Sequence, residues 1–526
     1  MRQPELVHEL LERSAVRTPD QPFLIQDGSV TTYGEVESHA NQLARVLIGQ
    51  GLSPGDRVAL LAQNSAFYVE AYFAIQKAGG IVVPLNTATN ARSAAEILDV
   101  CRARMLLVDQ RHQKTAVEAA SCCRSVFFLG IGGDLPDPET GSGTVCLDVI
   151  SARDIESKSP VQIERDEKDC TNIIFTSGST GKPRGAMLSH LNIVSNAISI
   201  VDYLRLGPDD RVLQVLPFFY VYGQSLLTTH ALVGGTIVIE NRFMYPKVAL
   251  DTLEETRCTG FSGVPSSFAI LLDRSDFAER ELPALRYVTA AGGAMNSALT
   301  RRLMAAMPER QIFIMYGATE ASARLSYLPP RDLPGKPNSI GKAIPGVELS
   351  VVTAEGREAE AGEEGEIVAR GSNIMSGYWE DEEATAEVLN GKALSTGDLA
   401  YRDEDGFLYV VGRKRDFIKA GANRVSAREV EEVIAEIPDI HEVAVVGVAD
   451  DVLGERICAF VVLREGSEVS VGMLTKSLRS KLPPYKMPSQ IFIRDDLPMN
   501  ESGKIDKRRL ARFVANEKEH RDVRDG

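Results

Sequence analysis

A glycine-rich stretch is the part of this sequence that points most directly to chemistry. Residues 174–185 read IFTSGSTGKPRG, and positions 176–185 hold three glycines, four hydroxyl side chains and two cations. Glycine permits backbone turns with φ > 0 that aim several N–H groups at one phosphate. A Walker A loop is excluded, because Thr176 stands where its first glycine belongs and Pro183 follows the lysine. The strand-like residues 172–175 argue against a flexible linker, so we predict a phosphate loop of another kind.

A second candidate site follows a predicted strand at residues 312–315. It reads Tyr316-Gly317-Ala318-Thr319-Glu320. A tyrosine ring can stack on a nucleobase, a threonine hydroxyl can bond a phosphate, and a carboxylate at a strand end can hold Mg²⁺. The alternative is a helix start with Thr319 or Glu320 as a cap residue.

Four weaker signals have ordinary alternatives. Residues 290–294, AAGGA, allow a flat ligand to approach the backbone, or form a simple strand-to-helix turn. Asp398, in a predicted loop after Gly397, suits a ribose diol, although an aspartate often serves only to form a turn. Arg413 and Lys504 each follow a glycine. A lysine is a mobile point charge for phosphate or carboxylate groups, but both cations have a solvated surface role as the alternative.

Predicted strands and helices alternate from residue 57 onward. Strands are expected at 58–61, 81–84, 105–108, 212–216, 236–239, 287–290 and 312–315, with helices at 67–77 and 193–204. Such alternation predicts mostly parallel sheets covered by helices on both faces. Ligands in such folds bind at the carboxyl ends of the strands, which is where the glycine-rich loop lies.

The character of the sequence changes after residue 333. Short β-like runs rich in glycine predict a small antiparallel or barrel-like subdomain at about 335–412, with Glu404-Asp405-Gly406 as a hairpin turn. A helix at 425–437 and strands at 443–448, 457–463 and 490–494 then predict a small α+β domain. We therefore expect an α/β protein. It has a large N-terminal domain, 1–413, with helix-covered sheets and the β-rich subdomain, and a small α+β C-terminal domain, 414–526.

Composition narrows the class of protein. The chain has 526 residues, and its net charge of -15 argues against nucleic acid as a main partner. No apolar run approaches the ~20 residues that span a bilayer, and the N-terminus lacks the apolar segment of a signal peptide. The seven cysteines and seven histidines are scattered without a disulfide framework or a zinc pattern. These observations predict a cytoplasmic protein.

Taken in order, these segments resemble the adenylate-forming superfamily of acyl- and aryl-CoA synthetases, luciferases and nonribosomal-peptide adenylation domains. The resemblance covers nearly the whole chain. It rests on the loop at 176–185, the Tyr-Gly-x-Thr-Glu segment at 316–320, Gly397-Asp398, Gly412-Arg413 and the lysine segment at 498–507. It implies that a carboxylate attacks the α-phosphate of Mg²⁺-ATP to give an acyl-adenylate and pyrophosphate, and that a thiol then displaces AMP. The implied cofactors and substrates are ATP, Mg²⁺ and CoA.

The resemblance also assigns roles residue by residue. Lys504 would bridge the acyl carboxylate and the α-phosphate, Thr319 would contact the α-phosphate, and Glu320 would bind Mg²⁺. The residues implied to hold the β- and γ-phosphates are Thr176, Ser177, Gly178, Ser179, Thr180, Gly181 and Lys182. Those implied to bind the adenosine are Gly292, Gly293, Ala294, Tyr316, Gly317, Asp398 and Arg413.

The resemblance further implies that the large domain holds two helix-covered sheets and that the small C-terminal domain is mobile, because members of the family rotate it about a hinge residue between the two steps.

Two departures from the family pattern concern this hinge and the acyl pocket. Arg415 stands at the hinge, where Asp or Lys is usual, and Tyr220 stands where many members have histidine. Tyr222, Met295 and Ser322 are the other expected pocket residues, with core packing as the alternative, favoured for Met295. The sequence thus predicts an AMP-forming acyl-CoA synthetase for a fatty or aryl acid, with a homodimer as one possible assembly.

Two rival functions stay open at this point. One is a stand-alone ligase that loads the phosphopantetheine of an acyl carrier protein. The other is an ATP-binding regulatory module without catalysis, which the presence of Thr319, Glu320, Asp398 and Lys504 disfavours.

Overall fold

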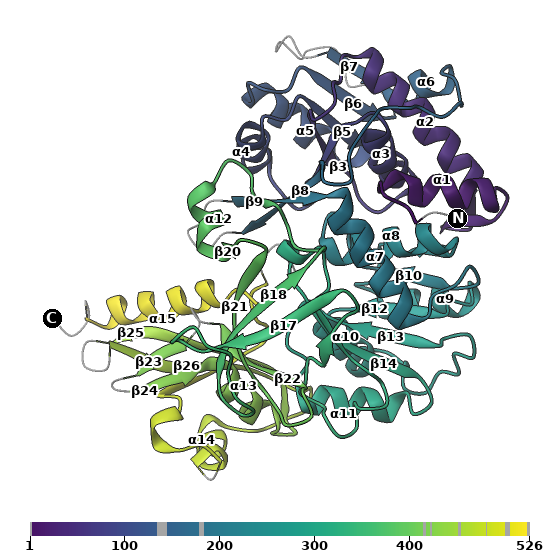
Figure 1. The fold of residues 1–526 in the computed structure, drawn as a ribbon. Coiled ribbons are helices and arrows are strands. Elements are labelled where there is room, and N and C mark those ends of the chain that lie inside the picture. Colours follow the sequence, from purple (N-terminus) through teal and green to yellow (C-terminus); the bar gives the residue numbers. More distant parts are fainter. Residues whose placement is uncertain are drawn as a thin grey trace.

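The computed structural model of the protein describes residues 3–133, 145–177, 183–413, 417–420, 423–450, 454–479, 481–499 and 505–522. Figure 1 shows a large N-terminal part in purple to green and a small C-terminal part in yellow-green and yellow. Two helix-covered sheets, a β-rich unit and an α+β unit follow one another along the chain. The predicted fold class is confirmed.

The first sheet is parallel except at the edge that carries the glycine-rich segment. There β8 and β9 run antiparallel, with Thr176 opposite Arg184, so the segment connects the two strands of a hairpin. The loop follows a strand, as predicted, but strand β9 was not expected. The strand order is β19(Gly377–Tyr378), β9(Pro183–Ser189), β8(Cys170–Ser177), β4(Ile81–Pro84), β3(Arg57–Leu61), β5(Met105–Asp109), β6(Phe128–Gly132), β7(Val145–Asp148).

The second sheet is parallel in its centre and antiparallel at both edges. The strands predicted at 236–239, 287–290 and 312–315 are β11, β13 and β14. The strand order is β16(Lys342–Ala343), β15(Ser326–Leu328), β14(Gln311–Tyr316), β13(Tyr287–Ala290), β12(Gly260–Gly263), β10(Arg211–Gln214), β11(Thr236–Ile239), β1(Pro22–Gln26), β2(Ser29–Thr32).

Helices separate and cover the two sheets (Figure 1). One hydrophobic core joins residues of both sheets to α2, α3, α7 and α8, so these helices lie between the sheets. The outer face of the second sheet packs against α9, α10 and α11, and that of the first against α4 and α5. The helices of this part are α1(His8–Arg17), α2(Tyr33–Gly49), α3(Ala66–Lys77), α4(Ala91–Cys101), α5(Gln113–Cys122), α6(Val149–Asp154), α7(His190–Leu204), α8(Val221–Val233), α9(Pro246–Glu255), α10(Pro265–Arg274), α11(Ser297–Ala306) and α12(Glu382–Val388), with short 3₁₀ turns at Gln110–His112 and Thr319–Ala321.

Local capping explains where several helices begin. Thr32 and Glu35 form a reciprocal capping box at α2, and Ser189 and Asn192 form another at α7. Each box satisfies backbone N–H groups that the first helical turn leaves without partners. The start of α7 after β9 therefore has a local cause in the sequence.

The β-rich unit is antiparallel, as its sequence predicts. One expectation was wrong here: Asp398 lies inside strand β21, opposite Arg413 of β22, and not in a loop. The local Thr396-Gly397 sequence suggests a turn, but pairing with β22 decides the conformation, and Gly397 takes φ 74° within the strand. The strands are β17(Val347–Val352), β18(Gly365–Gly371), β20(Leu389–Asn390), β21(Ala393–Arg402) and β22(Leu408–Arg413).

The C-terminal unit is a sheet with helices on both faces, and apolar clusters line each face. The helix predicted at 425–437 is shorter, because Val425 belongs to a strand and Ser426 caps the helix. The strands follow the order β24(Asn423–Ser426), β23(Phe417–Ala420), β26(Gly454–Leu463), β25(Ile440–Asp450), with β27(Gln490–Arg494) beside β26. The helices are α13(Ala427–Ala435), α14(Val471–Arg479) and α15(Lys507–Asp522), with a 3₁₀ turn at Pro484–Lys486.

An ion cluster connects this C-terminal unit to α10. The carboxylate of Asp273 lies 2.8 Å from Nδ1 of His441 on β25 and 2.8 Å from Nη1 of Arg464, and it also pairs with Arg302 of α11. Burial by itself raises the pKa of Asp273, but the hydrogen bonds from His441 and Arg302 and the charges of Arg302 and Arg464 hold it well below its usual range. Asp273 therefore links elements that lie far apart in the sequence.

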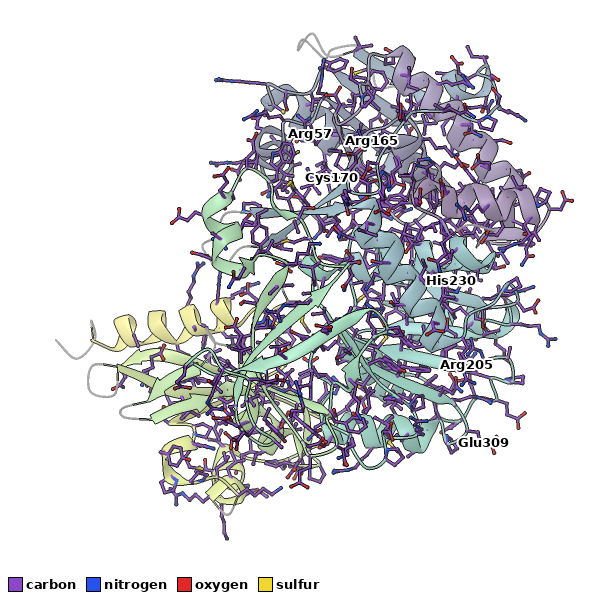
Figure 2. The ribbon with its side chains drawn as sticks, in the orientation of Figure 1. Arg57, Arg165, Cys170, Arg205, His230 and Glu309 are labelled. Atoms are coloured by element: carbon purple, nitrogen blue, oxygen red, sulfur yellow. The ribbon has the colours of Figure 1, made fainter. Side chains whose placement is uncertain are left out.

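Burial shifts the pKa of one cysteine and one histidine that are labelled in Figure 2. Cys170 is partly buried, and His230 is fully buried. Burial raises the pKa of Cys170 to about 12 and lowers that of His230 to about 4. All seven cysteines are free thiols. None of the helices in the described ranges combines the length and the apolar character that a membrane crossing requires.

Candidate active site

The candidate site is built around a loop that leaves the carboxyl end of β14. Directly after Tyr316, the chain passes through Gly317 and turns back, and Leu325 N–H donates to Tyr316 O at 2.9 Å. A Cβ on Gly317 would lie 1.8 Å from Ala323 O, so only glycine fits the return of the chain. This turn leaves Thr319 and Glu320 in a short 3₁₀ helix beside the strand end.

Tyr316, Asp398 and Arg413 form a connected polar cluster. The Tyr316 hydroxyl donates to Asp398 Oδ2 at 2.6 Å, and Arg413 Nε donates to Oδ1 at 3.1 Å. Asp398 is 7% exposed, whereas the side chain of Arg413 is 65% exposed. Burial, and then the charge of Asp398, raise the pKa of Tyr316 well above its usual value, so the phenol keeps its proton. Three residues predicted to bind the nucleoside therefore meet in one place.

The segment after β13 offers an open backbone surface. Gly292, Gly293 and Ala294 are exposed, and Gly292 has φ +82°. A positive φ is readily accessible only to glycine, which keeps this turn flat and free of side chains. The arrangement agrees with the predicted close approach of a planar group.

Glu320 has a partner that the sequence did not suggest. The hydroxyl of Tyr378 donates to Glu320 Oε1 at 2.7 Å, and Met375 N–H donates to the backbone oxygen of Glu320 at 2.9 Å. Tyr378 lies on β19, which pairs with β9, and the guanidinium of Arg184 on β9 lies 5.7 Å from its ring centroid. Strand β19 thus connects the predicted magnesium ligand to the hairpin of the glycine-rich loop. The local sequence Gly-Tyr-Trp around Tyr378 does not indicate that this tyrosine contacts the predicted magnesium ligand.

Glu320 suits a partly hydrated cation better than a complete protein cage. In the described part of the chain, no three His, Cys, Asp or Glu side chains gather as a metal-binding group. Mg²⁺ usually keeps several waters and binds through one or two carboxylates plus substrate phosphates. A single carboxylate held by Tyr378 fits that pattern.

The predicted pocket residues differ in their surroundings. Tyr220 precedes α8 and receives a bond from Asn86 Nδ2 at 3.2 Å. The hydroxyl of Tyr222 lies 2.8 Å from Thr289 Oγ1, and Ser322 Oγ donates to Asn373 O at 2.9 Å. Met295 is 5% exposed and belongs to the core against α10 and α11, the packing role named as its alternative.

Several predicted site residues lie outside the described part of the chain. They are Gly178, Ser179, Thr180, Gly181 and Lys182 of the loop, Arg415 of the hinge, Lys504, and the side chain of Ser177. Thr176 is described, and its hydroxyl donates to Arg184 O across the hairpin at 3.4 Å.

Two family models match the chain. The model of the AMP-binding enzyme matches residues 11–379, and that of the AMP-binding enzyme C-terminal domain matches residues 429–504. An indoleacetate–CoA ligase of Aromatoleum aromaticum is 30% identical, over 96% of this chain and 95% of its own length. The crystal structure of the anthranilate CoA ligase AuaEII with anthranoyl-AMP has a TM-score of 0.88 and 27% identity, and covers 98% of each chain. The o-succinylbenzoate CoA synthetase of Bacillus subtilis with ATP and magnesium has a TM-score of 0.82 and 29% identity, covering 95% of this chain and 98% of the other.

Proposed function

The chain belongs to the AMP-binding enzyme family, in its acyl-CoA synthetase and CoA ligase branch, and from this premise we propose that it activates a carboxylic acid with Mg²⁺-ATP and transfers the acyl group to CoA. In the first step a carboxylate oxygen attacks the α-phosphorus, and pyrophosphate leaves. In the second step the thiol sulfur attacks the acyl carbonyl, and AMP leaves. The Tyr316–Asp398–Arg413 cluster beside Thr319 and Glu320 is the observation that carries the proposal.

The cluster suits recognition of a nucleoside. A carboxylate that is 7% exposed and already held by two donors is fixed in orientation, so its remaining lone pairs can accept both hydroxyls of a ribose diol. Exposed Arg413 would reach the same diol from the solvent side. The ring of Tyr316 and the open surface at 292–294 would then border the adenine.

Side chains held in fixed positions would stabilise the negative charge at the reacting phosphate. Thr319 would bond the α-phosphate, and Glu320, oriented by Tyr378, would hold Mg²⁺. When bound, Mg²⁺ would offset negative charge on the phosphates. Groups that are already positioned stabilise developing charge without reorganising during the reaction, which is a large part of catalysis. The roles that we propose for Lys504 and for the loop at 176–182 rest on the resemblance of these two segments to family motifs.

We place the division between the two domains at residues 413 and 414, with Arg415 as the hinge. Arg413 is paired to Asp398 of the large domain, whereas residues from 417 onward pair within the C-terminal sheet. A rotation about this point would move Lys504 out of the site between the two steps, a hinge motion of the usual kind.

Exchange of labelled pyrophosphate into ATP tests the proposal. The purified enzyme should catalyse exchange only when an acid from a broad panel of aryl and aliphatic acids is present. With the active acid, CoA should then yield a thioester, and a carrier-protein phosphopantetheine should serve poorly. Exchange followed by transfer only to the carrier protein would contradict CoA as the acceptor, and no exchange with any acid would contradict the proposed activity.

A further inference from the structure

Arg324 is a buried cation whose described neighbours are all neutral. Arg324 is 2% exposed, and its guanidinium carbon lies 4.0 Å from the ring centroid of Tyr222. Nε donates to Met315 Sδ at 3.3 Å and Nη1 to Ala323 O at 3.4 Å. Burial raises the pKa of Tyr203, and the nearby charge of Arg324 opposes this rise. Within the described ranges no carboxylate lies within 4 Å of the guanidinium.

Other buried cations in the same protein have acidic partners. Lys77 is 1% exposed and pairs with Glu12 and with Glu37, the latter at 2.8 Å. Arg153 is 8% exposed and pairs with Glu70 at 2.6 Å. Removing a charge from water costs several kcal/mol, which a partner of opposite charge offsets. The chain thus provides this compensation elsewhere and omits it at Arg324.

A trapped water does not replace the missing anion. Near the backbone of Arg324, a cavity of about 10 Å³ is lined by Asn196, Gln224 and Ser322, enough space for about one water molecule. Asn196 Oδ1 and Gln224 Nε2 have no hydrogen-bond partner among the described residues, so one water suits these neutral atoms. A neutral water leaves the charge of Arg324 uncompensated.

Arg324 is positioned next to the predicted acyl pocket. It lies five residues after Thr319 on the loop that turns back from β14. Tyr222 contacts both the guanidinium, through its ring, and β13, through its hydroxyl. The hydroxyl lies 2.8 Å from Thr289 Oγ1, which is itself 2.7 Å from Ser262 Oγ. The backbone oxygen of Arg324 accepts hydrogen bonds from Asn196 and Asn373, so both the backbone and the guanidinium of this residue are held in place.

We infer that Arg324 binds a second carboxylate on the acid that is activated, so that the substrate is a dicarboxylic acid. The inference rests on the proposed function and names its substrate class. A guanidinium matches a carboxylate through two parallel hydrogen bonds, and the substrate supplies the anion that the fold omits. An acid of equal length with an apolar end leaves the buried charge unpaired, and a site built for a polar group rejects such an analogue strongly.

Matched acid pairs test the inference in the pyrophosphate exchange assay. The pairs are glutarate with pentanoate, adipate with hexanoate, and terephthalate with 4-methylbenzoate. We expect kcat/KM at least ~100-fold higher for the dicarboxylate of the preferred pair. Arg324→Gln should lower kcat/KM for that dicarboxylate at least ~100-fold and remove the preference within the pair.

Arg286→Gln is the matched control. Arg286 also lies over a tyrosine ring, 4.7 Å from the centroid of Tyr287, but it pairs with Asp210 at 2.9 Å. This variant should keep the acid preference of the wild-type enzyme. Equal loss of preference in both variants would overturn the role of Arg324.

The wild-type enzyme alone can also refute the inference. Exchange that favours the apolar member of every pair would overturn it while leaving the proposed synthetase activity intact, whether or not Arg324→Gln folds. No exchange with any acid would count against the proposed function instead. The melting temperature measured with ATP and each dicarboxylate would then decide. A dicarboxylate that raises the melting temperature of the wild-type protein but not of Arg324→Gln supports the inference, and no such rise in the wild-type protein overturns it.

Discussion

Replacing Asp398 by asparagine tests the nucleotide site most directly. The carboxylate accepts from Tyr316 at 2.6 Å and from Arg413 at 3.1 Å, and we propose that it also accepts from the ribose diol of ATP. Asparagine has nearly the same shape but no charge and only one acceptor oxygen. A hydrogen bond to a charged group contributes about 1.5–3 kcal/mol. Loss of one such bond should weaken ATP binding by roughly 10- to 150-fold.

The change should act on binding more than on folding. Asparagine Oδ1 can still accept from the Tyr316 hydroxyl, so the buried phenol keeps a partner. The side chain of Arg413 is 65% exposed, so water can hydrate its guanidinium in the variant. We therefore expect a melting temperature close to that of the wild-type enzyme, and a raised dissociation constant for a non-hydrolysable ATP analogue by titration calorimetry. Asp398→Ala should weaken ATP binding as well.

Tyr316→Phe is the companion variant. It keeps the aromatic ring and removes one of the two described donors to Asp398. Its effect on the dissociation constant should be smaller than that of Asp398→Asn, because the charge remains. If Asp398→Asn folds normally and binds the ATP analogue as tightly as the wild type, the ribose role of Asp398 is refuted.

Three further predictions concern separate parts of the enzyme. Lys504→Ala should abolish adenylate formation yet leave thioester formation from supplied acyl-AMP largely intact, and equal loss of both steps in rapid-quench assays would contradict the assigned role. Tyr378→Phe should raise the Mg²⁺ concentration needed for half-maximal exchange roughly 10-fold, since one hydrogen bond of about 1–1.5 kcal/mol no longer orients Glu320; an unchanged Mg²⁺ dependence would show that this contact is dispensable. Asp273→Asn should lower the free energy of unfolding by roughly 1–3 kcal/mol at pH 7, measured in urea. The pKa of Asp273 is lower in the folded than in the unfolded protein, so this contribution to stability is fully present above the unfolded pKa of ~4 and is lost as the pH falls through the folded pKa. A difference in stability between wild type and variant that persists at very low pH would contradict this reasoning.

Local sequence accounts for much of the framework. The strands at Thr236–Ile239, Tyr287–Ala290 and Gln490–Arg494 were predicted at their observed bounds, and the strand predicted at 457–463 begins three residues earlier, at Gly454. Buried strands between helices are continuous apolar runs, which is a strong local signal. The alternation of these runs with helical segments was enough to predict mostly parallel sheets covered by helices.

Pairing between distant strands was beyond such local signals. The glycine-rich loop closes a hairpin because β9 pairs with β8, although residues 183–189 carry no clear strand pattern. Asp398 has the local sequence of a turn but lies in a strand, because β22 supplies backbone partners along its length. In both segments, hydrogen bonds to another strand outweighed the local preference.

The sequence by itself determined which side chains carry chemistry, because residue type and spacing along one segment suffice for a phosphate loop or a Tyr-Gly-x-Thr-Glu turn. Only the tertiary structure decided which of them meet. It joined Tyr316 to Asp398, oriented Glu320 through Tyr378, and left Arg324 buried without an acidic partner among the described residues. Those relations join residues of different strands and loops, and burial and charge compensation depend on the folded surroundings, which no single segment encodes.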